Sequence, residues 1–198
     1  MLWREIRIVE GEKIMKKLGF LALGLGLALC TVSSRAQQAA APASGPVANP
    51  VTTMVKSQLP RFEKNMVGAA ELMPPDKYSF KATPESASFG HMVAHSLQAN
   101  YGLCSKISGT AAPEVKLTDA DSKDKLVAGL KESFEFCTTA LANADDSKLG
   151  DPMTAGPFQT SRAGVLILLS DEWFDHYAAL ATGLRLNGIL PPSAQPKK

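Results

Sequence analysis

The sequence contains few residues of the kinds that usually carry catalysis: three cysteines, three histidines and an aromatic content of 7%. It has no Cys-x-x-Cys pair, no Gly-x-Ser-x-Gly turn and no glycine-rich phosphate loop, so it offers no recognisable setting for a nucleophile or a nucleotide. It also lacks a basic patch and any interleaving of aromatic and basic residues, so nothing argues for a nucleic-acid partner. No internal repeat and no convincing β-strand pattern is present.

What is present suits one ordinary domain preceded by a targeting segment. The chain has 198 residues, of which 45% are hydrophobic and 20% are charged, a normal globular balance. The formal charge of +2 is misleading, because residues 1–36 hold six Lys/Arg and three Asp/Glu. The rest of the chain holds fifteen basic and sixteen acidic residues, a net charge of about −1.

The clearest pattern is a secretory signal peptide in residues 1–36. Lys16-Lys17 supplies the positive region, Leu18 to Val32 the apolar region, and Ser34-Arg35-Ala36 the small residues at positions −3 and −1. We therefore predict cleavage before Gln37. The mature protein is then extracytoplasmic, either periplasmic or secreted, and has no membrane attachment.

Three alternatives concern the same segment. A retained anchor needs roughly 20 apolar residues to span a bilayer, which is more than this run supplies. Lipid attachment at Cys30 would need a small residue before the cysteine, where Leu29 stands. Residues 1–14 do not resemble the start of a signal peptide, so Met15 is an alternative start.

Four segments with helical periodicity follow an uncharged tether rich in Ala, Pro and Ser at residues 37–50. Apolar residues recur at steps of three and four in each of them: 52–73, 83–107, 118–141 and 160–187. We predict an all-α fold, a four-helix bundle over residues 51–192 with long crossover connections and a disordered tail at 193–198.

The helix boundaries leave some alternatives open. The first helix is either kinked at Pro60 or begins there. Thr83 or Ser86 is expected to cap the second helix, and the third is expected to begin near Thr118 or Asp119. Residues 150–157 are interpreted as a Gly/Pro loop, and Gly188 is expected to end the fourth helix.

Glu172 and His176 are the most informative pair of residues. They lie four apart, hence on one face of the fourth helix, in the middle of its apolar stripe. An unpaired buried carboxylate is costly, so Glu172 needs a metal, a cation or hydrogen-bond donors as a partner. Helical bundles build metal sites with this spacing. The alternative is a position at the end of the bundle where both groups reach water.

His91 and His95 form a second pair four residues apart. On a helical wheel His95 lies at the edge of the buried stripe, and His91 lies about 40° further toward the polar side. His95 is therefore the better candidate for an inward-facing residue. The alternative for either histidine is a solvent-facing or hydrogen-bonded side chain.

Two stretches of sequence resemble the DinB superfamily. Met73-Pro74-Pro75-Asp76-Lys77-Tyr78 and the following residues up to Val93-Ala94-His95 resemble its first helical hairpin. The run from His176-Tyr177 to Pro191-Pro192 resembles its C-terminal signature. The resemblance covers roughly residues 52–192, and its middle is generic helix.

The resemblance implies a four-helix bundle that binds one divalent metal through three histidines. His95 matches the ligand from the second helix and His176 the last ligand of the fourth. Glu172 occupies the remaining ligand position, where the family has histidine. A His₂Glu set is known for catalytic zinc, and Zn²⁺, Ni²⁺, Mn²⁺ and Fe²⁺ are the candidate metals.

Relatives in the family include thiol-dependent transferases and isomerases. We therefore expect a metal-dependent enzyme, either a thiol-dependent transferase or a hydrolase-like enzyme, acting on a small molecule, with a thiol as one candidate substrate. The alternative is a non-catalytic binding or structural bundle whose metal site has degenerated. The sequence leaves the substrate and the oligomeric state open, a homodimer included.

Cys104 and Cys137 are the two cysteines that remain after the predicted cleavage. Both lie on the inner stripes of their helices, and disulfides persist outside the cytoplasm. We predict a disulfide between them. The alternative is two ordinary buried thiols, because free cysteine is among the most buried residue types.

Overall fold

The structure is a computed structural model that describes residues 45–196. The predicted signal peptide, its cleavage site, Cys30 and most of the tether lie outside the described residues. No helix in the described part is long and apolar enough to cross a membrane.

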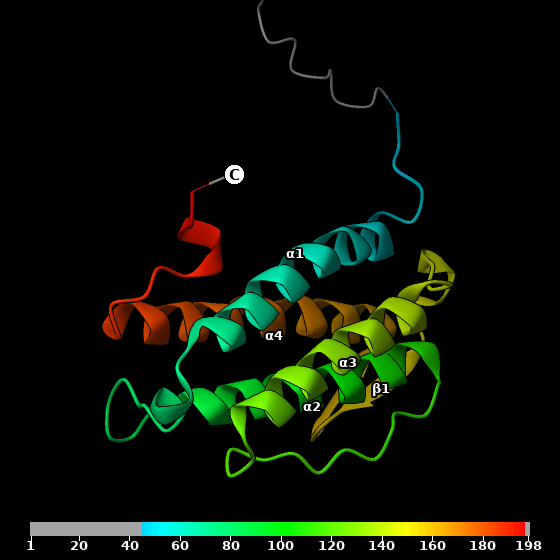
Figure 1. The fold of residues 1–198 in the computed structure, drawn as a ribbon. Helices are drawn as coiled ribbons and strands as arrows, with labels where there is room; N and C mark the ends of the chain where they lie inside the picture. Colours follow the sequence, from blue (N-terminus) through cyan, green and yellow to red (C-terminus); the bar gives the residue numbers. More distant parts are fainter. Residues whose placement is uncertain (1–44, 197–198) are drawn as a thin grey trace, which may run out of the picture. The chain divides into compact units, whose positions relative to one another are not determined.

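Four long helices make up most of the described chain, which confirms the predicted all-α four-helix bundle (Figure 1). They are α1 (Pro50–Leu72), α2 (Phe89–Ser108), α3 (Lys123–Leu141) and α4 (Arg162–Leu186). Three short 3₁₀ helices lie in the connections and after α4: η1 (Pro75–Lys77), η2 (Asp146–Lys148) and η3 (Pro192–Ala194). A two-stranded hairpin of β1 (Pro152–Ala155) and β2 (Phe158–Ser161) precedes α4.

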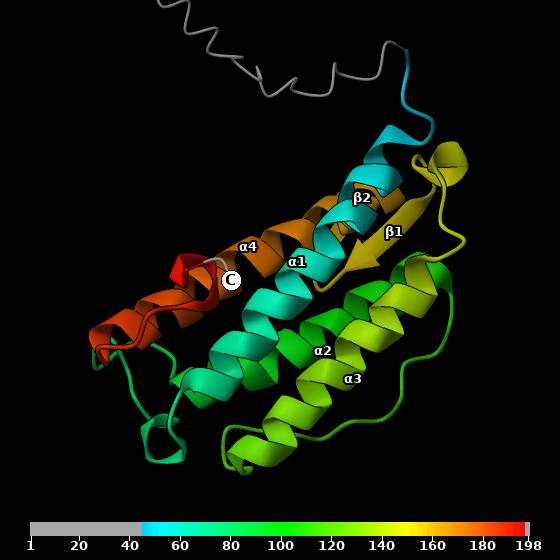
Figure 2. The ribbon, with the colours of Figure 1, turned by 45° about the horizontal axis from the view of Figure 1, so that its top comes forward.

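The helices are arranged so that α1 and α2 each pack against both α3 and α4 (Figure 2).

Contacts along the helices show in which direction each helix runs relative to its neighbours. Gln58 bonds Ser170 and Phe62 packs on Phe174, so α1 and α4 run parallel. Asn100 bonds Ser133, and Cys104 is bridged to Cys137 further along, so α2 and α3 also run parallel. Lys56 bonds the carbonyls of Ala142 and Ala144 just beyond α3, and Lys123 bonds Met73 beyond α1, so the two parallel pairs are antiparallel to each other.

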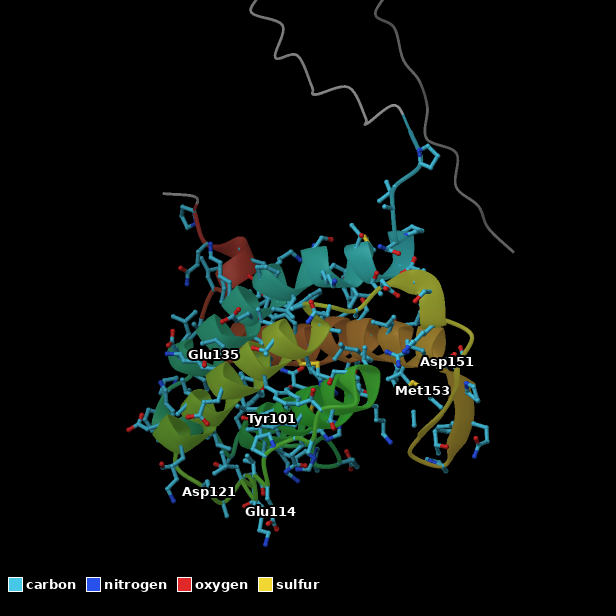
Figure 3. The ribbon with its side chains drawn as sticks, turned by 90° about the vertical axis from the view of Figure 1, so that its right-hand side faces the viewer. Tyr101, Glu114, Asp121, Glu135, Asp151 and Met153 are labelled. Carbon is cyan, nitrogen blue, oxygen red and sulfur yellow. A yellow bond between two sulfur atoms is a disulfide. The ribbon has the colours of Figure 1, made fainter. Side chains whose placement is uncertain are left out.

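Because α2 and α3 are parallel neighbours, the chain must return along the bundle between them. Residues 109–122 make this return, and Figure 3 shows Glu114 and Asp121 on it, along the outside of α2 and α3. Gln98 of α2 donates a hydrogen bond to the Leu117 carbonyl at 2.8 Å, which fixes the segment to the helix. The predicted long crossover is therefore present, and it joins the second and third helices.

Serine caps define where α2 and α3 begin, and they differ from the residues predicted. Ser88 accepts a hydrogen bond from the His91 amide, and Ser122 accepts one from the Lys125 amide. The predicted caps are used elsewhere. Thr83 and Ser86 bond each other in a turn, and the Thr118 amide donates to Asp121. Polar residues in successive turns compete for the cap position, which the sequence pattern did not resolve.

Helix α1 continues through Pro60 from its start at Pro50, which excludes the alternative of a start at Pro60. Its first turn is capped by Asp146 of η2, which follows α3. The Val51 and Thr52 amides each donate to its carboxylate at 2.9 Å, and the Thr52 hydroxyl donates at 2.8 Å. In return, the Asp146 amide donates to the Asn49 side chain at 3.2 Å.

The hairpin corrects the interpretation of residues 150–157 as a loop. Its strands pair from Pro152 with Ser161 to Ala155 with Phe158, around a turn in which Gly156 has φ 55°. Each strand has four residues and only Ala155 is buried, so the segment has too little periodicity to be recognised as strands. Figure 3 shows Asp151 and Met153 where the hairpin leaves the bundle.

The tail predicted to be disordered from residue 193 begins with ordered structure. In η3 the Ser193 amide donates to the Tyr177 hydroxyl at 3.0 Å, and that hydroxyl bonds the Ser193 side chain at 2.6 Å. Gly68 of α1 leaves room for Pro192, which an added side chain there would crowd. Pro192 and Tyr177 therefore hold residues 192–194 against α1 and α4.

The predicted disulfide between Cys104 and Cys137 is confirmed. The two Cα atoms lie 5.3 Å apart, within the range that a disulfide spans, and both residues are fully buried. Parallel α2 and α3 bring positions of equal depth along the two helices next to each other, which is why the two cysteines meet.

Candidate metal centre

The antiparallel packing of α2 and α4 brings together the three predicted ligand residues. One ligand atom each of His95, Glu172 and His176 lies within 4.8 Å of the other two. Glu172 Oε2 is 3.1 Å from His176 Nε2 and 3.7 Å from His95 Nε2. The two imidazole rings meet nearly edge to face, with centroids 4.8 Å apart. The arrangement places two nitrogens around one carboxylate oxygen.

The three side chains differ in their exposure, which gives the cluster a closed side and an open side. The His176 side chain is 7% exposed, Glu172 25% and His95 50%. Packing on the buried side fixes His176, while His95 leaves the cluster accessible from solvent. A metal ion held here would keep coordination positions open toward water or a small molecule, as catalytic sites require.

Glu172 Oε2 supports this interpretation because it is buried and has no hydrogen-bond partner in residues 45–196. A buried carboxylate oxygen without a partner is costly, although His176 Nε2 lies close to it. A cation between the oxygen and the two ring nitrogens would satisfy all three atoms. The residues present therefore fit a divalent metal, and His₂Glu is a donor set used by catalytic zinc.

The pKa of His176 is lowered from its ordinary value. Burial is the main cause, Glu172 opposes it, and His95 adds to the lowering. The neutral imidazole is therefore favoured near neutral pH, and this is the form that coordinates a metal.

His91 lies outside the three-residue cluster. It is exposed on α2, and its ring lies almost parallel to that of His95, with centroids 6.2 Å apart. The helical wheel placed it on the polar side, and the structure leaves it there. The assignment of ligands among the three histidines stays a prediction that substitutions can test.

A buried polar network under the cluster was not predicted from the sequence. The Trp173 indole donates to Asn100 Oδ1 at 2.7 Å, and the Asn100 amide donates to Ser133 at 3.0 Å. Ser133 in turn donates to the Leu130 carbonyl at 2.7 Å. The network joins α4, α2 and α3 next to Glu172. Asn100 on the predicted buried stripe was the signal that could have indicated it, because a buried amide requires partners.

The fold and the cluster define a class: a four-helix bundle with a His/Glu group, suited to a divalent metal, between its second and fourth helices. The model of the DinB superfamily matches residues 58–180, and the chain belongs to that superfamily. The predicted membership of this superfamily is thereby confirmed.

Two solved structures share the fold. The crystal structure of the DinB-like protein YjoA from Bacillus subtilis is 21% identical, with a TM-score of 0.58, over 73% of this chain and 99% of that one. A mutant of a mycothiol-dependent maleylpyruvate isomerase is 14% identical, with a TM-score of 0.54, over 65% of this chain. The chain spans 60% of that isomerase. No curated protein matches the chain in sequence.

Proposed function

We propose that the chain is an exported DinB-superfamily protein that binds a divalent metal through His95, Glu172 and His176. The observation that carries the proposal is the buried Glu172 Oε2, which has no hydrogen-bond partner in the described part of the chain and faces two imidazole nitrogens within 3.7 Å. Three donors from two antiparallel helices converge on one point, and each can donate a lone pair.

The proposed activity is a metal-dependent reaction of a small molecule, a thiol being the leading candidate. A Zn²⁺, Ni²⁺, Mn²⁺ or Fe²⁺ ion held by these residues would act as a Lewis acid that lowers the pKa of a bound thiol or water. The fold similarity to a mycothiol-dependent isomerase supports a thiol. His176 and Glu172 fix the site on the buried side, and the half-exposed His95 leaves access from solvent.

Export is proposed from the signal pattern in residues 1–36, and the Cys104–Cys137 disulfide supports it. Disulfides form and persist in oxidising compartments and are rare in the cytosol. N-terminal sequencing of the exported protein should give Gln37 as the first residue. A lipid-bearing start at Cys30 would contradict the predicted cleavage site.

A second candidate function is a non-catalytic binding bundle with a degenerate site. Metal-bound histidines usually donate their second ring N–H to a protein group or water. No hydrogen bond from either Nδ1 atom of His95 and His176 to a protein group occurs in residues 45–196. Together with Glu172 at a position where the family has histidine, this observation favours the alternative.

Metal analysis of the mature protein purified without chelator distinguishes the two functions. If the protein is a metal-dependent enzyme, it carries a stoichiometric metal, and added Zn²⁺, Ni²⁺ or Mn²⁺ raises the melting temperature of protein from which metal has been removed. No metal and no shift would support the second.

Single substitutions test the ligand set. His95→Ala and His176→Ala should each weaken metal binding by more than about 100-fold. Losing a ligand should cost more than replacing a residue that hydrogen-bonds a ligand, which lowers metal affinity by about 10–100-fold. His91→Ala is the matched control and should leave affinity unchanged. Equal losses in His91→Ala and His95→Ala would show that the ligand set is wrong.

A further inference from the structure

A groove of about 490 Å³ lies beside the candidate metal centre, between the segment of residues 80–89 and α4. Its volume falls within the roughly 300–1,000 Å³ of small-molecule sites. Both helices that supply the metal ligands also line it. Met92 precedes His95 by one turn on α2, and Asp175 directly precedes His176 on α4. A ligand in the groove therefore has one end next to the centre.

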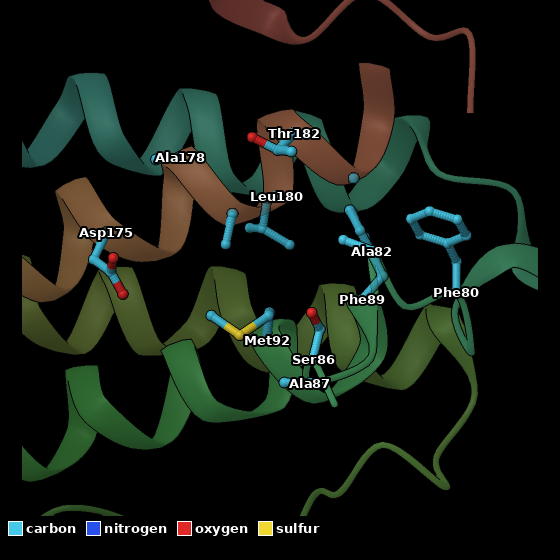
Figure 4. A pocket seen from close by; sticks show the side chains of 12 residues that line it. Phe80, Ala82, Ser86, Ala87, Phe89, Met92, Asp175, Ala178, Leu180 and Thr182 are labelled. Carbon is cyan, nitrogen blue, oxygen red and sulfur yellow. The ribbon is translucent and has the colours of Figure 1, made fainter. Parts of the chain in front are cut away.

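The groove is apolar along its length and carries one charge. Nine of its twelve lining residues are apolar, and Asp175 is the only ionisable residue among the twelve. Figure 4 shows Asp175 and Phe80 at opposite ends, with Met92 between them. The lining matches a molecule with an apolar body and one polar end.

The charged residues around the groove determine whether the polar end of a bound ligand is positive or negative. Asp171, Glu172 and Asp175 lie within five residues of α4, and the next basic residue along the helix is Arg185. Asp175 makes no ion pair within residues 45–196, so its carboxylate is available to a ligand. An anionic ligand group beside Asp175 would be repelled, whereas an ammonium group would form a charge-assisted hydrogen bond.

We propose that this groove binds a small primary amine with an apolar body. The ammonium group bonds the Asp175 carboxylate, and the apolar body packs between Met92 and Phe80. This inference deepens the proposed function by giving its small molecule an ammonium end, which one substrate can carry together with a thiol, and it rests on that function only for the claim that the bound amine is a substrate. The binding itself requires no metal.

The probes are 4-phenylbutylamine and its neutral analogue 4-phenylbutan-1-ol, titrated into the full mature protein by calorimetry or NMR. The amine should bind at least about threefold more tightly, the size expected for an exposed charge pair. This preference should shrink as the salt concentration rises. Asp175→Asn should abolish the preference for the amine. Asp171→Asn, which replaces an acidic residue of the same helix outside the groove, should retain that preference.

Ala179→Trp tests the place of binding, because Ala179 is an exposed residue that lines the groove. Filling the groove there should remove binding of both probes. Equal affinities for the two probes, a preference that survives Asp175→Asn, or no binding of either probe would overturn the proposal. Repeating the titration after removal of metal with EDTA distinguishes the metal-site proposal from the amine-binding proposal. If only the metal site is wrong, amine binding is unaffected; if only the groove is wrong, metal binding is unaffected.

Discussion

Glu172 is the residue in which the cluster departs from three histidines, and it brings a carboxylate where the family has an imidazole. Carboxylates favour hard cations and imidazoles favour borderline ones such as Zn²⁺ and Ni²⁺. The residue at position 172 should therefore tune which metal binds, while His95 and His176 set where it binds.

Glu172→His should raise the affinity for Zn²⁺ and Ni²⁺ by about tenfold, at the lower end of the changes measured around metal sites. Competition with a chromogenic chelator measures the change. Glu172→Gln is the control, because it keeps the shape of the side chain but removes the charge, and it should bind more weakly than wild type. Unchanged affinity in both variants would mean that residue 172 does not reach the metal.

The sequence predicted the three residues of this cluster unequally. Glu172 and His176 lie on one helix, so their spacing alone placed them on one face. His95 lies on another helix, and periodicity could show that it pointed inward but not which helix it faced. The family resemblance supplied that pairing. Trp173 was missed because α4 is buried over a wider arc than a single stripe.

Among the elements, α4, α2 and α3 are held in register by Asn100. This residue is 1% exposed, and its side chain bonds both Trp173 and Ser133. Replacing it leaves the buried Trp173 indole N–H without a partner, removes one of the two hydrogen bonds of Ser133, and opens a small cavity.

Asn100→Ala should therefore lower the free energy of unfolding by about 2–4 kcal/mol, since an unsatisfied buried group costs about 1–3 kcal/mol and the cavity adds to that cost. Urea unfolding monitored by Trp fluorescence measures it. Ser133→Ala removes only one member of the network and should cost less. A smaller loss for Asn100→Ala than for Ser133→Ala would contradict the central role of Asn100.

The cap that Asp146 provides to α1 makes the stability of the bundle depend on pH. Burial tends to raise the pKa of Asp146, but the hydrogen bonds from Thr52 and Val51 outweigh it and lower that pKa. The carboxylate therefore stabilises the folded state fully above the unfolded value of about 3.9, and this stabilisation is lost as the pH falls through the lower folded value.

Asp146→Asn should reduce the melting temperature at pH 7 and have a progressively smaller effect as the pH falls below about 4. Thermal unfolding of both proteins over this range checks it. Asp171→Asn, which removes an exposed carboxylate elsewhere, should show no such convergence. A difference that persists at the lowest pH would show that the charge of Asp146 is not what stabilises α1.

The elements themselves were predictable to different degrees. Long helices with a continuous apolar stripe were identified within a few residues, because twenty residues carry several full periods. Helix starts were shifted, since Ser88 and Ser122 cap the helices in place of earlier polar residues, which bond within their own turns. The hairpin at residues 152–161 was missed because main-chain bonds between two short exposed strands leave no pattern of hydrophobicity.

At the scale of the whole molecule, the disulfide closes a loop that contains the crossover and most of α3. Cys104 and Cys137 are 33 residues apart in sequence. Cross-linking over such a distance restricts the unfolded chain and stabilises the folded one by about 3–4 kcal/mol in the chain-entropy account.

The double variant Cys104→Ala/Cys137→Ala should therefore lose about 3–4 kcal/mol of unfolding free energy. Urea unfolding with and without reductant measures this. Reductant should destabilise the wild type by a similar amount and leave the double variant unchanged. Two titratable thiols in the folded wild-type protein would contradict the bridge.

The crossover of residues 109–122 connects the half of the chain that contains His95 to the half that contains Glu172 and His176. A protease cut within it would yield one fragment with α1, α2 and His95, and another with α3, α4, Glu172 and His176. The Cys104–Cys137 bridge spans the cut, so both fragments would stay covalently joined. The nicked protein would remain a single species until reduced, and the halves of its candidate metal centre would separate only when bridge and packing were both lost.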